Sequence, residues 1–391
     1  MLFCPKRSVE KTPPSAFRPK HCPWRQCANH KPRLRREFRY VRLGFFQRKG
    51  DGRRIQRFRC LTCGHTFSQQ SFACTYYLKR PELLLPVAAG LNAGSAHRQL
   101  ARSLGCAPST VTRLSARLGR HALLFHARAM DQIPTITETV VLDHFETFAY
   151  SQNDPVGIAT PVGHSSWFVF DLEPAPHRRA GRTTEFQRAK RARQDIAPPA
   201  EGQYTTSVLN VLDRLVDKIP PDGLLALNVD DHPAYPSALQ RHPQGRRFQA
   251  RVFPNPERGP KGAPRSDEAI HRDQALFPVD LLHLIWRHTC ANHRRETIAS
   301  ARRTNAILER GYLMVVWRNF VKRRSEQRSR SDTPAMKLGL AQRPWTWSEV
   351  FSRRLFPERM KLPEPWMAVY QRKLVTPALK QNAAHILARA Y

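Results

Sequence analysis

The spacing of apolar and polar positions predicts a series of alternating strands and helices in the second third of the chain. Residues 136–150 (ITETVVLDHFETFAY) read as a strand that carries Asp143 among apolar residues. The segments VGIATP and SSWFVFDLEP predict the next two strands of a meander. Residues 205–219 have helical periodicity, and the apolar run 224–229 predicts a buried strand that ends at Asp230.

Three more elements complete this pattern. A helix (PAYPSALQRH), a strand (RRFQARVF) and a helix near LFPVDLLHLIWRH follow, so the predicted order is β-β-β-α-β-α-β-α. That order is the topology of the ribonuclease-H-like fold, a mixed α/β architecture. A core of this fold is therefore expected to span 135–325, with a basic, proline-containing surface insertion at about 175–203.

A different pattern precedes the strands. In residues 95–122 (SAHRQLARSLGCAPSTVTRLSARLGRHA), apolar positions recur at helical spacing on both sides of Gly105, where an inter-helix turn needs an unusual φ. This pattern predicts a DNA-reading helix-turn-helix within 78–125, and the alternative is an ordinary helical hairpin. The residues of the second helix expected to face the bases are Ser109, Thr110, Thr112 and Arg113.

The charge of the chain favours a nucleic-acid partner. The 391 residues include 65 Lys and Arg against 31 Asp and Glu, a formal net charge of +34, which is typical of a protein that binds a polyanion. The excess is uneven, because residues 1–140 hold 26 Lys and Arg and only 6 Asp and Glu. Charge alone does not separate a DNA-binding protein from a generic RNA-binding one.

Four of the eight cysteines are arranged as metal ligands. Cys22 and Cys27 form a C-x4-C pair, and Cys60 and Cys63 form a C-x2-C pair. Four thiolates on tight turns suit tetrahedral Zn²⁺. The segment between the pairs alternates aromatic and basic residues around a Gly-Asp-Gly turn, as a hairpin does. A zinc ribbon is therefore expected at 18–70, and four unrelated buried thiols are the alternative.

No apolar stretch reaches the roughly 20 residues that span a bilayer, and the N-terminus lacks the apolar segment of a secretory signal. These features predict a cytoplasmic protein without a membrane partner. In that compartment clustered cysteines indicate metal binding and not disulfides.

The two acids at the strand ends predict a metal-dependent active site. In the ribonuclease-H-like fold the first strand and the end of the fourth lie side by side, so Asp143 and Asp230 would meet and a third acid would come from the following helix. Three converging carboxylates repel one another unless they bind cations such as paired Mg²⁺ or Mn²⁺ ions. A turn solvated by Asp230 and Asp231 is the alternative.

The combination of a C-x4-C/C-x2-C ribbon, a helix-turn-helix and this acidic core resembles bacterial insertion-sequence transposases of the DDE class. Residues 293–340, with the segments VVWRNF and TPAMKLG, strengthen the resemblance, which covers roughly residues 20–340. It implies that Asp143 and Asp230 are metal ligands, that double-stranded DNA is the substrate and that the protein acts as a homo-oligomer in synapsis.

The candidates for the third acid are Glu268, Asp280, Glu296 and Glu309, and the preferred one departs from the usual Glu of that class. Asp280 is expected to open an apolar helix, and Arg287 follows two turns later on the same face, a spacing similar to the family's catalytic helix. Glu296 is the runner-up. The arginines expected to contact phosphate are Arg287, Arg294 and Arg295.

The expected function is therefore DNA cleavage and strand transfer at the terminal repeats of an insertion element. The alternatives are a non-enzymatic DNA-binding regulator, an inactive transposase remnant, and a nuclease of the same fold that does not transfer strands. Residues 326–391 are expected to form a C-terminal helical region without assigned chemistry.

Overall fold

In the computed structural model the chain divides into two compact units, Met1–Pro81 with Phe351–Arg359, and Glu82–Val350 with Met360–Tyr391. The segments expected to hold the helix-turn-helix and the catalytic core fall largely within the second unit. The structure describes residues 17–31, 38–179, 183–192, 199–257, 259–260, 262–294, 297–328, 330–379 and 381–382.

The first unit is built on a three-stranded antiparallel sheet with the order β1-β2-β3. The predicted hairpin is confirmed, because Tyr40 pairs with Cys60 and Gln47 with Arg54 on the two sides of the Gly-Asp-Gly turn. Gly52 adopts a φ of 69° in that turn, a conformation that favours glycine. The strands are β1 (Tyr40–Gln47), β2 (Arg54–Cys60) and β3 (Thr66–Ser68).

Aromatic rings form the small core of this unit. Phe38, Phe58 and Phe67 are buried together with the cysteines at 22, 27 and 60. The rings of Phe58 and Phe67 stack with their centroids 5.5 Å apart. This core is small, and in small domains a bound metal commonly adds to the stability that apolar burial supplies.

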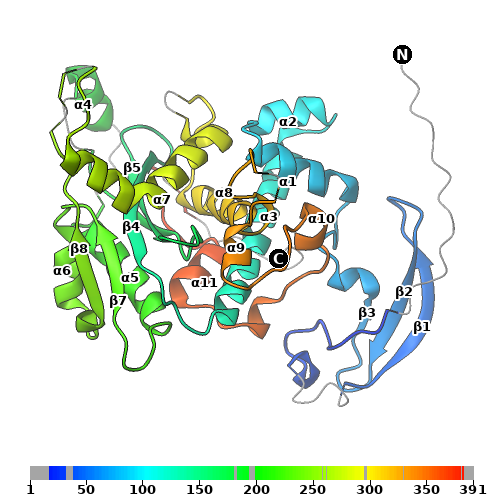
Figure 1. Cartoon of the computed structure of the whole chain (residues 1–391). Helices are drawn as coiled ribbons and strands as arrows, with labels where there is room; N and C mark the ends of the chain where they lie inside the picture. Colours follow the sequence, from blue (N-terminus) through cyan, green and yellow to red (C-terminus); the bar gives the residue numbers. More distant parts are fainter. Residues whose placement is uncertain are drawn as a thin grey trace. The chain divides into compact units, whose positions relative to one another are not determined.

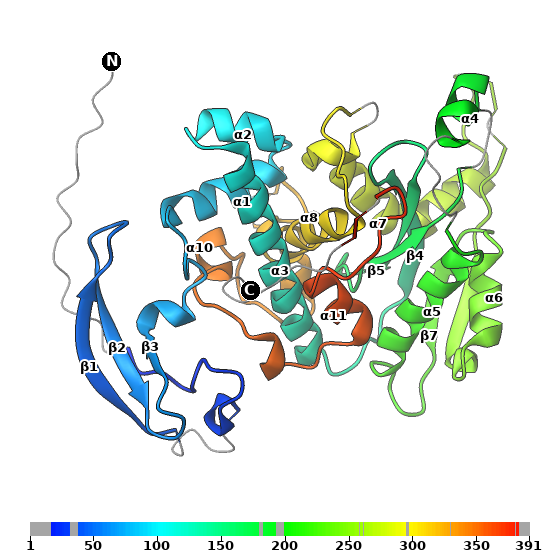
Figure 2. The ribbon, with the colours of Figure 1, turned by 180° about the vertical axis from the view of Figure 1, so that it is seen from behind.

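The second unit contains a five-stranded mixed sheet with the order β6-β5-β4-β7-β8, which confirms the mixed α/β class. β5 runs antiparallel to β4 and β6, whereas β7 runs parallel to β4 and β8. In both views α7 lies beside β4 and β5, and α5 and α6 lie next to β7 (Figures 1 and 2). The bounds are β4 (Val140–Phe148), β5 (Pro155–Gly163), β6 (Glu173–Pro176), α5 (Gln203–Val216), β7 (Leu225–Val229), α6 (Ala234–Arg241), β8 (Phe248–Val252) and α7 (Asp267–Thr289).

The third strand lies later in the chain than the sequence indicates. The apolar segment SSWFVFDLEP was expected to be the strand, but β6 begins only at Glu173. The segment still meets β5 at one point: the backbone N–H of Gly163 donates to the carbonyl of Phe168 and that of Phe170 donates to the carbonyl of Pro161, both at 2.9 Å, so that Val162 and Val169 form an isolated bridge. The register between the two segments then shifts by one residue before Ala159 pairs with Glu173, so the continuous strand begins only there.

The helix that carries Asp280 begins earlier than predicted, so the expectation that Asp280 opens it is wrong. α7 starts at Asp267, where the Ser266 hydroxyl accepts a hydrogen bond from the backbone N–H of Ala269 at 3.2 Å. Asp267 and Glu268 add negative charge to the first turn, which the helix dipole favours. Asp280 therefore lies in the middle of a 23-residue helix.

The segment for which the sequence predicts a helix-turn-helix forms three helices. Gly105 connects α2 and α3 with a φ of 56°. From Leu114 onward α3 is buried on nearly all sides, and a Cβ at Gly119 would lie 2.3 Å from the backbone oxygen of Glu309 in α8. The helix α3 is therefore both the predicted DNA-reading helix and a buried, central helix of the second unit. The bounds are α1 (Leu84–Asn92), α2 (His97–Ser103), α3 (Pro108–Gln132) and α8 (Thr304–Val316).

Short helices complete the described part of the chain. The expected surface insertion contains α4, which stands away from the sheet in both views (Figures 1 and 2). In the TPAM segment, the Thr333 hydroxyl accepts a hydrogen bond from the backbone N–H of Met336 and caps α9, so that motif has a structural role. The bounds are α4 (Glu185–Ala192), α9 (Pro334–Lys337), α10 (Trp347–Val350) and α11 (Glu364–Tyr370), and a π-helical turn covers Trp317–Val321.

A buried ionic network ties α5 to the start of β6 and to the residue two positions before it. Arg214 forms ion pairs with Asp171 and with Glu173, the latter at 2.6 Å, and all three side chains are buried. The indole N–H of Trp366 donates a hydrogen bond to Asp171 at 2.8 Å, which joins the C-terminal helix α11 to the network. The two carboxylates depend on one guanidinium for charge compensation.

We expect Arg214→Met to lower the free energy of unfolding of the second unit by about 3–5 kcal/mol, because the variant leaves two buried carboxylates without their cation. Chemical denaturation measures this change. The exposed Arg188 of α4 provides a matched control, Arg188→Met, for which a change below about 0.5 kcal/mol is expected. Equal stabilities of the two variants would contradict the assignment.

Candidate functional site

The four predicted zinc ligands converge in the first unit. Cys60 ends β2, Cys63 follows in the turn to β3, and Gly64 takes a φ of 71° there. The Sγ atoms of Cys22 and Cys63 lie 3.8 Å apart, as do those of Cys27 and Cys60. All four sulfur atoms lie within 4.8 Å of one another.

These distances fit a tetrahedral ion. Four Zn–S bonds of about 2.3 Å place neighbouring sulfurs about 3.8 Å apart, whereas a disulfide would need about 2.05 Å. Burial raises the pKa of Cys22 and raises that of Cys27 to about 11, so these thiolates need a nearby cation. The cysteine cluster is therefore compatible with structural zinc.

Two of the histidines near the cysteines, His21 and His65, have other partners. The Nδ1 atom of His21 lies 3.0 Å from the carbonyl oxygen of Cys22, and the ring packs edge-on against Phe72. The ring of His65 stacks on Trp24 with the centroids 4.2 Å apart. The four thiols alone supply the donor set.

The second candidate site lies in the middle of the five-stranded sheet. The parallel register pairs Val141 of β4 with Asn228 of β7, so two residues further along Asp143 is level with Asp230. Neighbouring strands lie about 4.8 Å apart. The two predicted catalytic acids are thus brought to adjacent strands at the end of β7.

Alternation along β4 sends its side chains to opposite faces of the sheet. The Phe145 ring stacks on Trp286 of α7 with a centroid distance of 4.5 Å. The next side chain before it, His144, reaches Ser207 of α5 at 2.9 Å. Asp143 has the same parity as Phe145 and faces α7.

The environment of Asp143 disfavours its negative charge. Its Oδ1 accepts a hydrogen bond from the backbone N–H of His144 at 2.7 Å, and its Oδ2 lies 3.7 Å from Nδ1 of His283. Burial, followed by the carboxylate of Asp230, raises the pKa of Asp143 to about 7. A divalent cation would offset both effects, and carboxylate oxygens are the donors that Mg²⁺ and Mn²⁺ prefer.

Asp280 lies near this pair but has a cationic partner of its own. It forms an ion pair with Arg272 two turns earlier in α7, and its side chain is 40% exposed. Its charge also raises the pKa of Asp143, with a smaller effect than Asp230. The runner-up acid Glu296 and the neighbouring Arg295 lie outside the described residues.

The three aspartates are spread more widely than the cysteines. Among the residues that the structure describes, the cysteines form the one group of three or more His, Cys, Asp or Glu ligands whose atoms all lie within 4.8 Å. At least one pair of the aspartate carboxylates is therefore further apart than that. The ligands of two ions about 3.5–4 Å apart are themselves further apart than the ligands of one tetrahedral ion. A wider separation of the aspartates is therefore consistent with a two-ion site.

The two described arginines predicted to contact phosphate differ in their surroundings. Arg287 donates a hydrogen bond from Nη2 to the carbonyl oxygen of Glu146 at 2.7 Å, and its guanidinium lies 4.6 Å from the centroid of the Phe145 ring. It therefore joins α7 to β4. Arg294 is exposed, and its guanidinium lies beside Gly94 after α1.

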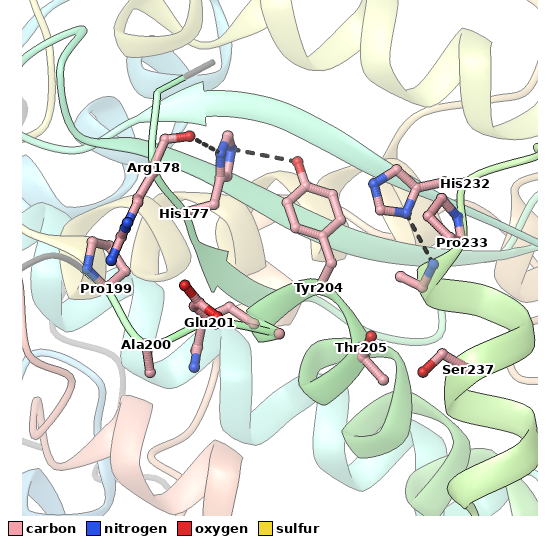
Figure 3. Close-up of a pocket in the computed structure, with 13 residues that line it drawn as sticks. His177, Arg178, Pro199, Ala200, Glu201, Tyr204, Thr205, His232, Pro233 and Ser237 are labelled. Atoms are coloured by element: carbon pink, nitrogen blue, oxygen red, sulfur yellow. Dashed lines mark hydrogen bonds between the residues drawn. The ribbon is translucent and has the colours of Figure 1, made fainter.

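A cavity of about 510 Å³ opens on the other face of the sheet, where Tyr204 of α5 and His232 contribute to its lining (Figure 3). Tyr204 lies between two imidazoles, with ring centroids 4.3 Å from His144 and 4.9 Å from His232. The Tyr204 hydroxyl donates a hydrogen bond to Glu146, and burial and this carboxylate raise the pKa of Tyr204. The exposed Arg178 adds positive charge at the rim.

The predicted base-facing residues lie at the start of α3. Ser109, Thr112 and Arg113 are exposed, and Thr110 is half-buried. The Thr112 hydroxyl donates a hydrogen bond to the carbonyl oxygen of Pro108 at 3.0 Å, which holds this side chain against its own helix. The exposed arginines of α2, which the sequence pattern did not single out, are Arg98 and Arg102.

The sequence prediction also missed His283 and Thr160. His283 lies three residues after Asp280, so helical spacing puts both on one face of α7. Thr160 pairs with Asp143 across β4 and β5, and its hydroxyl lies 2.8 Å from Nε2 of His283. The i, i+3 spacing was a usable signal for His283, whereas only the strand register identifies Thr160.

Among the residues that the structure describes, none of the helices combines the length and the apolar character that a membrane span requires. Comparison with known proteins found no matching family model and no matching curated sequence.

Proposed function

We propose that this chain is a DDE/DDD-type transposase, which cuts and rejoins DNA at the ends of an insertion element with Mg²⁺ or Mn²⁺. The observation that carries the proposal is the register of the central strand β4 with β7, which puts Asp143 level with Asp230 directly after the end of β7. Counted along the chain, the strand order is third, second, first, fourth, fifth, the order expected of a ribonuclease-H-like core. The neighbouring positions of these two carboxylates and this topology together support a metal-dependent phosphoryl transfer site.

Each acidic residue has a separate role in this proposal. Asp143 and Asp230 would hold the divalent cations, and Asp280 would complete the set from α7 once it leaves Arg272. The cations would supply an activated water or 3′-hydroxyl and stabilise the leaving oxygen. Arg272, whose charge also acts on Asp143, would help to draw the DNA phosphate toward the acids.

The remaining parts of the chain would bind DNA. The first unit would act as a zinc ribbon, and α2 and α3 as a helix-turn-helix whose second helix reads the major groove. The two ribbon strands β1 and β2 carry positive charge toward solvent, which suits contacts with phosphates. Their exposed arginines are Arg42, Arg54, Arg57 and Arg59.

The experiment that tests the proposal is a cleavage and joining assay on DNA carrying the two flanks of the coding region, with Mg²⁺ or Mn²⁺. Joined products that require the cation support a transposase. Cleavage without joining would favour a nuclease of the same fold. Binding without cleavage would favour a regulator or an inactive remnant.

Arg113→Ala is expected to weaken binding to the element's ends by about 5- to 150-fold, because a base or phosphate contact at the start of α3 is lost. Binding measured at several salt concentrations separates the two contacts: a lost phosphate contact lowers the salt slope by about 1. The exposed Arg246 lies outside α2 and α3, so Arg246→Ala is the control variant that removes one positive charge elsewhere on the chain. Equal weakening by both variants would contradict a reading role for Arg113.

Two broader features belong to the same proposal. Joining of two DNA ends in one complex favours a homo-oligomer, because each end needs its own acidic site. A cytoplasmic location is proposed from the clustered reduced cysteines and from the DNA substrate.

A further inference from the structure

The hydrogen bonds around Thr160 define which nitrogen of His283 carries a proton. The single hydroxyl hydrogen of Thr160 is donated to the carbonyl oxygen of Asp143 at 2.9 Å. The hydroxyl oxygen of Thr160 also lies 2.8 Å from Nε2 of His283. Because its only hydrogen is already donated, this oxygen can only accept a hydrogen bond from the imidazole. Nε2 of His283 is therefore the protonated nitrogen.

The other nitrogen of this ring is turned toward the acidic site. Nδ1 of His283 lies 3.7 Å from Oδ2 of Asp143, which is longer than a hydrogen bond. The ring is held in place by Thr160 and by Phe145, whose ring centroid is 5.2 Å away, and the side chain is 14% exposed. A nitrogen lone pair and a carboxylate oxygen thus face each other across a short gap.

This distance suits two ligands of one ion. With bonds of about 2.1 Å, two ligand atoms on the same cation lie roughly 3 to 4.2 Å apart, depending on the angle between the bonds. A histidine that binds a metal through one nitrogen usually donates the other N–H to a fixed acceptor. Thr160 is such an acceptor, and it is itself held by the backbone of Asp143.

We propose that His283 is a further metal ligand of the acidic site and binds the cation held by Asp143 through Nδ1. The inference rests on the proposed function, because it assumes that Asp143 holds a divalent cation. An acid and a histidine three residues apart on one helix also form a recurring carboxylate–histidine ligand pair in helical metal sites. Asp280 and His283 have that spacing in α7.

A nitrogen ligand changes which cation the site prefers. Mg²⁺ strongly prefers oxygen donors, whereas Mn²⁺ accepts imidazole more readily and follows the same geometry. The mixed donor set therefore favours Mn²⁺ over Mg²⁺. Replacement of His283 by an oxygen donor is expected to reduce that preference.

The test is Mn²⁺ binding to the zinc-loaded full chain, followed by electron paramagnetic resonance with detection of ¹⁴N coupling from a coordinated imidazole. The wild type is expected to bind Mn²⁺ with this coupling. His283→Gln should weaken Mn²⁺ binding about 10- to 100-fold and abolish the coupling at saturating Mn²⁺. His288→Gln, an exposed position on the same helix, should change neither quantity.

Thr160→Val keeps the proposed metal ligand His283 but removes the hydroxyl that accepts its Nε2–H and orients the ring. A roughly 10-fold loss of Mn²⁺ affinity with the ¹⁴N coupling retained is expected, which also covers the case that His283→Gln does not fold. Coupling that persists in His283→Gln, or that is lost in His232→Gln instead, would overturn the inference.

The outcomes also separate this inference from the proposed function. Mn²⁺ that binds the wild type without ¹⁴N coupling, and is lost in Asp143→Asn, would leave the acidic metal site intact and remove His283 from it. A wild-type chain that binds no Mn²⁺ beyond its zinc centre would overturn both the inference and the metal-dependent function.

Discussion

Asp143→Asn is expected to lower DNA cleavage and joining by on the order of 10³-fold or more, with DNA binding retained. The asparagine keeps the shape of the side chain but removes the negative charge that would hold a divalent cation between β4 and β7. Several kcal/mol of transition-state stabilisation by the metal would be lost, which corresponds to a rate effect of this size. The cleavage and joining assay, with DNA binding measured in parallel, checks the result.

The matched control for this variant is Asp231→Asn. Asp231 is adjacent to Asp230 but exposed, and no expected metal contact depends on it. Its cleavage rate should stay within a few-fold of the wild type. A similar loss in both variants would indicate a general electrostatic effect and would contradict a ligand role for Asp143.

Asp143→Asn lowers the expected activity, but it should raise the free energy of unfolding. Burial and Asp230 raise the pKa of Asp143 to about 7, so without a divalent cation its ionised form opposes folding. That penalty is absent below the ordinary carboxyl pKa near 4, grows as the pH rises, and is complete above about pH 7. Asp143→Asn is therefore expected to be more stable than the wild type at pH 8 by up to a few kcal/mol, and equally stable at pH 4. Urea denaturation at the two pH values, without divalent cations, measures this difference.

Cys60→Ser is expected to remove zinc from the chain and to unfold the first unit. Its buried core is a small group of aromatic rings around the cysteines, and Cys60 lies 3.8 Å from Cys27 within the cluster. Structural zinc sites in small domains contribute roughly 10–16 kcal/mol of apparent binding energy, which is more than such a core supplies. Metal analysis and circular dichroism during thermal unfolding, with and without a chelator, check the expectation.

The control for the zinc variant is Cys106→Ser. Cys106 is half-buried in the turn before α3 and does not belong to the cysteine cluster. It should retain one equivalent of zinc and both unfolding transitions. A wild-type chain without bound zinc, or a first unit that stays folded in Cys60→Ser, would contradict the structural role of the metal.

Local patterns in the sequence determined most of the element order and the cysteine cluster. Paired cysteines on tight turns and a Gly-Asp-Gly hairpin are encoded within a few residues, and both appear where they were predicted. The strand order followed from the number and order of the elements. The helix α5 before β7 allows β7 to run parallel to β4 and to pair with it, on the side that β5 does not occupy. Asp143 and Asp230 are neighbours for that reason.

Contacts between distant segments decided the remainder. Pairing with β5 determines where β6 begins, because the register between the two segments shifts by one residue after Val169, and no pattern within SSWFVFDLEP reveals that shift. Asp280 was misplaced in its helix because the capping residue Ser266 precedes a polar first turn that lacks an apolar stripe. Likewise, the contact of His283 with Thr160 and Asp143 joins a helix to two strands more than a hundred residues earlier. The local sequence thus determined the elements and the central acids, whereas only the tertiary structure decided which side chains surround them, because those contacts depend on packing between segments that are far apart in the chain.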